Sequence, residues 1–147
     1  MAYSTQDDVQ MAAGGEKKLL ELSDIETEGE INAEVVAQAV ADADAEIDSY
    51  ARQRFSVPFN PVPAIVRQKS AEEAAFLLKQ RRQGSFIDDR DLAARQTRLD
   101  WLRDLSRGLV TPGLAASPTK SEAVSASLVE PSSEASRGTR RALRGFV

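Results

Sequence analysis

The stretch that decides the fold is residues 32–54, NAEVVAQAVADADAEIDSYARQR. Its apolar residues recur at steps of four, three, four and three: Val36, Val40, Ala43, Ile47 and Tyr50. This spacing places them on one side of a helix, because an α-helix completes a turn in about 3.6 residues. Asn32 can cap the first turn, so we expect a long helix that runs to about Arg54 and buries one side.

Small and acidic residues alternate along the same helix. Alanines at positions 37, 39, 41, 43 and 45 permit close approach of a neighbouring helix. Four acids fall mostly off the apolar stripe: Asp42, Asp44, Glu46 and Asp48. They are candidates for an acidic face that meets a neighbouring subunit or lines a channel. A solvated helix face is the simpler alternative.

Downstream, prolines at 58, 61 and 63 end this helix, since proline pushes the residue before it out of the α region. Phe55, Val57 and Phe59 alternate within the link, which we expect to tuck a loop onto the domain. A further helix is predicted from about Ala64 to Gln83, broken by Gly84. Its predicted inner face consists of Val66, Ser70, Ala74, Leu77 and Leu78, while the acids Glu72 and Glu73 are expected on the solvated surface.

The last helix is predicted to begin after Asp88 or Asp89 and to close at Gly108, with Pro112 preventing continuation. Its predicted buried side consists of Leu92, Leu99, Leu102 and Leu105, with Trp101 alongside. Upstream of the long helix, two short helices are expected. The first is capped by Ser4 or Thr5 and ends at Gly14-Gly15, and the second covers about 16–22.

An acidic turn precedes the long helix. From Asp24, acids occupy positions one, three and five of a calcium-loop pattern, with Gly29 at six and Ile31 at eight. Position twelve is Val35, where such a loop needs a bidentate glutamate. We therefore favour a tight acidic turn over a calcium site.

The fold class that follows is all-α, a small bundle of about four to five helices, one of them long. Residues 1–112 form the helical domain and residues 113–147 an extended C-terminal arm that becomes ordered on assembly, because its scattered apolar residues sustain no helical or strand period. The arm ends in a mixed basic and apolar tip, which suits docking better than nucleic-acid binding: Arg137, Arg140, Arg141, Leu143, Arg144, Phe146 and Val147.

Composition narrows the function. The 147 residues include no cysteine and no histidine, so the strongest nucleophile and the commonest general base are both missing. We expect a protein that is not an enzyme and that uses no cofactor or metal. No run of about 18 apolar residues is present, so no membrane span is expected. The net charge of −4 argues against a protein whose main task is gripping nucleic acid.

The charges are segregated along the chain. Residues 21–48 hold ten acids and no base, whereas residues 52–82 hold seven bases and two acids. Lys79, Arg81 and Arg82 are candidates for a basic face that meets the acidic block of the next subunit. The arginines of the arm could serve the same purpose. Separated blocks of opposite charge supply two different patches, and complementary charge between such patches would fix the register and orientation of their contact.

Several segments together resemble Mu-type head–tail connector proteins of tailed bacteriophages. The opening MAYSTQDDV (1–9), ADADAEIDSY (41–50) followed by RFSVPF (54–59), WLRDLSRG (101–108) and RALRGF (141–146) occur in the order seen in that family. The departures are QMAAG at 10–14, which lacks the basic and aromatic residues expected there, and KQRR at 79–82.

The resemblance implies a helical adaptor, or head-completion subunit, that binds beneath the portal protein as a ring of twelve copies. DNA would pass through the ring without specific binding. A tail-side neck, stopper or tail terminator protein would dock below it. The implied location is the neck of the virion, after synthesis in the host cytoplasm. The alternative is a free-standing helical regulatory or nucleic-acid-binding protein, which would bind DNA in a salt-dependent way.

Overall fold

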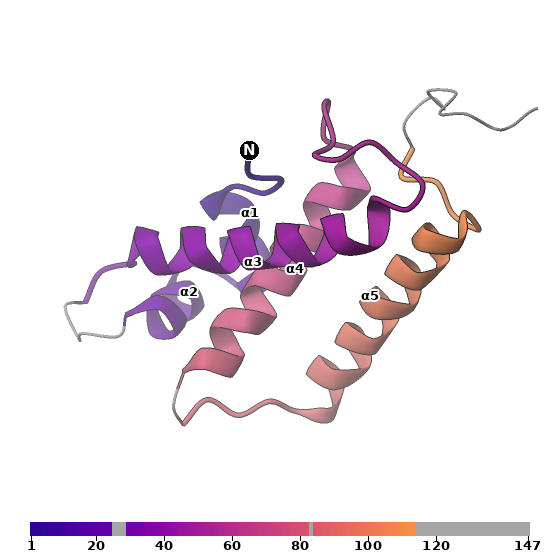
Figure 1. Ribbon diagram of the computed structural model, residues 1–147. Helices are drawn as coiled ribbons and strands as arrows, with labels where there is room; N and C mark the ends of the chain where they lie inside the picture. Colours follow the sequence, from indigo (N-terminus) through magenta and orange to yellow (C-terminus); the bar gives the residue numbers. More distant parts are fainter. Residues whose placement is uncertain (25–28, 83, 114–147) are drawn as a thin grey trace, which may run out of the picture.

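Two helices, α3 (Ala33–Ala51) and α4 (Ala64–Arg81), cross at the centre of the domain and pack against each other more extensively than any other pair (Figure 1). The computed structural model describes residues 1–24, 29–82 and 84–113. Three further helices pack on this crossing: α1 (Gln6–Ala13), α2 (Glu16–Ser23) and α5 (Asp89–Arg107). The described residues contain no strand, so the predicted all-α bundle is confirmed.

The helix ends follow local chemistry. Thr5 and Asp88 each form a capping box with the residue three positions on, and Asn32 Oδ1 accepts hydrogen bonds from the backbone N–H groups of Glu34 and Val35, both at 3.1 Å. These bonds satisfy N–H groups that have no partner inside the helix. Gly108 ends α5 in the left-handed conformation, with φ of 78°. The predicted caps are thus confirmed, with Thr5 and Asp88 chosen from their pairs of candidates.

The core is divided into two apolar clusters by the crossing. One joins α1 and α2 to the N-terminal half of α3 and the C-terminal half of α4, and includes Val9, Leu19, Val36 and Leu78. The other joins α5 and the proline-rich link to the opposite halves. Its buried members are Tyr3, Ile47, Ala51, Phe59, Val66, Leu102 and Leu105.

The proline-rich link packs as predicted. Phe59 is 1% exposed, and its ring lies 5.8 Å from the ring of Tyr3 and 6.1 Å from that of Phe55, measured between centroids. The helix before the link is shorter than expected. It ends at Ala51, whose carbonyl oxygen accepts hydrogen bonds from the N–H groups of both Arg54 and Phe55 as the chain turns inward.

The first half of α5 is attached by charge rather than by apolar packing. Leu92, predicted to be buried, is 54% exposed. Glu73 of α4, predicted to be solvated, is only 5% exposed and accepts hydrogen bonds from Arg95 Nε at 3.0 Å and Arg98 Nε at 2.9 Å. Both guanidinium groups also lie over the Phe76 ring, 5.0 and 5.8 Å from its centroid. These two predictions were wrong because arginines one turn apart turn toward Glu73 and rotate Leu92 outward.

Replacing Glu73 with alanine should lower the free energy of unfolding by about 3–5 kcal/mol, because buried Arg98 would lose its ion-pair partner. The matched control is Glu72→Ala, which removes the partly exposed pair with Lys69 and an exposed hydrogen bond from Gln68, and should cost less than about 1 kcal/mol. Urea denaturation of the two variants measures the difference. Equal losses would show that Glu73 does not hold α5 in place.

Candidate assembly surfaces

The four acids predicted to form one face of α3 lie on two sides of the helix. Residues two apart are separated by about 200° around a helix, so Asp42 and Glu46 share one side while Asp44 and Asp48 share another. The structure therefore does not bring them together in a single acidic face. This division could have been found from their spacing alone.

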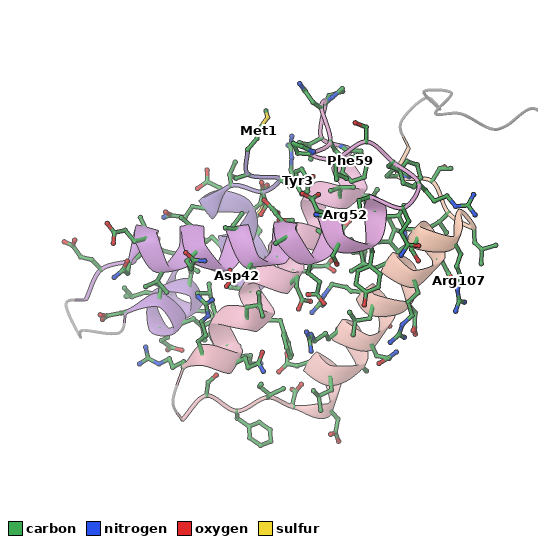
Figure 2. All side chains as sticks on the ribbon, viewed as in Figure 1. Met1, Tyr3, Asp42, Arg52, Phe59 and Arg107 are labelled. Atoms are coloured by element: carbon green, nitrogen blue, oxygen red, sulfur yellow. The ribbon has the colours of Figure 1, made fainter. Side chains whose placement is uncertain are left out.

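Asp44 and Asp48 hold the N-terminal segment against α3. Asp44 is 8% exposed, accepts a hydrogen bond from the backbone N–H of Tyr3 at 2.8 Å and is also bonded by the Ser70 hydroxyl. The Tyr3 hydroxyl donates to Asp48 and accepts from the Phe59 N–H at 3.0 Å. Tyr3 and Phe59 lie together beside α3 in Figure 2. Asp44 is therefore mostly buried against the N-terminal segment, which corrects its prediction as an exposed residue of an acidic face.

Burial raises the pKa of the Asp44 carboxyl, and the nearby negative charge of Asp48 raises it further. Hydrogen bonds from Ser70 and Tyr3 and the attraction of the terminal amino group oppose this shift. The pKa of the Tyr3 hydroxyl is also raised, mainly by burial and by its hydrogen bond to Asp48. Tyr3 of the N-terminal segment and Asp44 and Asp48 of α3 thus share a partly buried, negatively charged environment.

On the other side of α3, Asp42 and Glu46 face the remaining helices. Asp42 forms an ion pair with Arg81 of α4, and Glu46 lies 3.9 Å from Arg95 of α5. Burial raises the pKa of Glu46, and the negative charge of Glu73 adds to the effect. Both acids therefore help to fix the packing of α4 and α5 against α3.

The three predicted basic residues all have partners inside the subunit. Lys79 pairs with Asp91 at the start of α5, and this hydrogen bond is the main reason that the pKa of Asp91 is lowered. Arg82 donates its Nη1 proton to the backbone carbonyl oxygen of Asp24 at 2.8 Å. Together with the Arg81–Asp42 pair, these contacts hold the end of α4 against α3, the start of α5 and the residue that follows α2. A contact between them and another subunit stays a prediction.

The outer side of α3 carries a row of exposed alanines at 37, 41 and 45, whereas the alanines at 39 and 43 are buried against α4. A shallow groove of about 350 Å³ runs along this row. Asp44 and Asp48 line it together with Met1 and Pro58. Sequence reasoning noted the alanines but did not separate the inner from the outer set, which the helical period distinguishes.

A second groove, of about 300 Å³, lies between α1, α2, α4 and the first half of α5. Apolar and charged side chains line it side by side, including Leu22, Phe76, Lys79 and Arg98. The Arg98 Nη2 atom is buried and has no hydrogen-bond partner among the described residues. This adds to the cost expected if its single ion-pair partner, Glu73, were removed.

Several predicted features fall outside the described residues. The acidic turn that echoes a calcium loop includes residues 25–28, and all of the arm beyond Gly113 lies outside as well. Within the described ranges, no group of three or more acidic side chains is arranged to hold a metal ion. None of the helices in the same ranges is both long and apolar enough to cross a membrane.

The sequence profile of the family described as Bacteriophage Mu, Gp36 matches residues 3–130. The chain belongs to the bacteriophage Mu Gp36 family. The match begins in the N-terminal segment that Tyr3 anchors, covers α1 to α5 and continues into the predicted arm. The Mu-type resemblance is thereby confirmed at the level of the family. No curated protein matches the chain significantly.

The buried carboxylate offers a test of how this Mu Gp36 family member holds its N-terminal segment. Asp44→Ala should lower the free energy of unfolding by about 1–3 kcal/mol, because the Tyr3 N–H and Ser70 hydroxyl lose a buried acceptor. The control Asp42→Ala breaks an exposed pair with Arg81 and an exposed hydrogen bond from Gln38, and should cost less than about 1 kcal/mol. Thermal or urea denaturation checks the order, and a larger loss for Asp42→Ala would refute it.

Proposed function

We propose that the chain is a structural adaptor, or head-completion subunit, of a tailed bacteriophage. It forms a ring below the portal, links the DNA-filled head to the tail and extends the DNA channel. The observation that carries this proposal is the Mu Gp36 family match over residues 3–130. The order of connector-like segments along the chain supports it. The proposal gives the chain no catalytic step and no cofactor.

The architecture suits a building block. Hydrogen bonds and ion pairs join α3 to the N-terminal segment, to α4 and to α5, so the domain can meet its neighbours as one rigid unit. The outer row of small side chains on α3 and the groove beside α5 are different surfaces on one subunit. Two unlike patches are what a closed ring requires, since each subunit meets its two neighbours through different faces.

Assembly would combine several modest contacts. In the proposed ring of twelve copies, each subunit touches two neighbours, the portal above and a stopper or tail terminator protein below. Such multivalent contacts give a stable complex although each interface is weak alone. The arm, residues 113–147, adds a further contact to those made by the surfaces of the helical domain. DNA passes through the ring without sequence-specific contacts.

Removing residues 137–147 should leave the helical domain folded but weaken its incorporation into connector particles by at least about tenfold, because a multivalent complex loses one of its linked contacts. Incorporation can be measured by the amount of chain that sediments with purified portal-containing particles. Circular dichroism confirms that the truncated domain is folded. Equal incorporation of truncated and full-length chains would rule out the docking role of the arm.

A charge-matched comparison separates the arm from a general effect of arginine. Arg140→Ala with Arg141→Ala should reduce incorporation, whereas Arg103→Ala with Arg107→Ala on the outside of α5 should not. Imaging of native particles provides the test of location. A ring of this chain below the portal supports the proposal, and particles that join heads to tails without the chain contradict it.

A further inference from the structure

The outer side of α3 carries a row of small side chains. α3 crosses the front of the domain, and no other helix lies over it (Figure 1). Three consecutive turns expose an alanine along this side, at Ala37, Ala41 and Ala45, with the exposed Gln38 beside the row. A solvated helix face usually carries long polar residues, whereas alanines let another chain approach the backbone closely.

The groove over these alanines is negative. Asp44 and Asp48 line it and no lysine or arginine does, so the terminal amino group of Met1, which attracts Asp44, offsets only part of their negative charge. Arg52, the next base along the chain, donates its Nε proton to the backbone carbonyl oxygen of Asp48 and does not line the groove. Met1, which is 86% exposed, and Pro58 add apolar walls. An occupant that fits would be basic, with apolar side chains between its charges.

The bases that sequence reasoning offered as partners for this acidic helix are engaged elsewhere. Arg81 is bound to Asp42 on the other side of α3, Lys79 to Asp91, and Arg82 to a backbone carbonyl oxygen. The remaining basic block is residues 137–147, which hold four arginines, no acid and the apolar residues Leu143, Phe146 and Val147. Its composition therefore complements the groove in both charge and apolarity.

We propose that the groove along Ala37, Ala41 and Ala45 of α3 receives the segment 137–147 of a second copy of this chain. The inference rests on the proposed ring, in which neighbouring copies are held close together. Reach does not limit it, because residues 114–147 can span up to about 110 Å at about 3.3 Å per residue. The arm of each subunit would then bind to α3 of the next subunit around the ring.

Cysteine cross-linking tests this directly, since the natural chain has no cysteine. Full-length Ala41→Cys and Leu143→Cys chains are mixed, concentrated or assembled into connector particles, and oxidised. We expect a linked dimer that forms at least about tenfold faster than the dimer of Leu143→Cys with Thr97→Cys, because docking raises the local concentration of the two thiols. Thr97 is the matched control, since it lies exposed on α5.

Two variations sharpen the outcome. Raising the salt from about 50 mM to about 500 mM should slow the specific cross-link several-fold, because salt screens the attraction between the arginines and the carboxylates. A double variant that carries both cysteines distinguishes the source of the arm. If it links only within one chain while the mixed single variants do not link, the arm folds back on its own subunit and the proposal is overturned.

The remaining outcomes decide between this inference and the proposed function. Equal rates with Ala41→Cys and Thr97→Cys, or no link in either solution or particles, would overturn the α3 site. If particles still required residues 137–147 in that case, the adaptor role would stand and the arm would dock elsewhere. A specific cross-link in free chains that never enter connector particles would support the α3 site and refute the adaptor role.

Discussion

The close crossing of α3 and α4 is the constraint on which the rest of the structure depends. Ala39 and Ala43 meet Ala71 and Ala74 inside the same apolar cluster, and these methyl side chains let the two helices approach closely. Bulkier residues at the crossing would force the helices apart and open both halves of the core. The remaining helices and the proline-rich link cover the two halves of α3 and the two halves of α4 on either side of this crossing.

Much of this fold was predictable because its signals are local. Thr5, Asn32 and Asp88 carry side-chain acceptors where helices begin, and Gly108 supplies the left-handed residue where the last one ends. Leu92 and Glu73 could not be placed in this way. Their burial depends on how α5 is rotated against α4, and that rotation is decided by two arginines that reach one glutamate across the interface.

The pairing of charged residues at the candidate site was also not predictable from the sequence. The separation of acids from bases along the sequence is real, but several of these charges form ion pairs inside the subunit, among them Lys79 with Asp91, Arg81 with Asp42 and Arg95 with Glu73. The number of acids and bases along the chain does not show which of them form pairs, because pairing depends on the side of the helix that each residue occupies. Asp42 and Asp44 are an example, since they lie on different sides of α3. Since Lys79, Arg81 and Arg82 are bound inside the subunit, residues 137–147 are the other predicted basic block that a neighbouring surface could bind.

The anchored N-terminal segment has a practical consequence for handling the protein. Tyr3 is tied to Asp44, Asp48 and the Phe59 N–H, so the residues before it are held next to the outer side of α3, where Met1 is visible in Figure 2. An affinity tag fused to Met1 would start at the rim of that helix and crowd it. A purification handle is better inserted in the α4–α5 connection, near the outward-pointing Phe86, which lies at the surface.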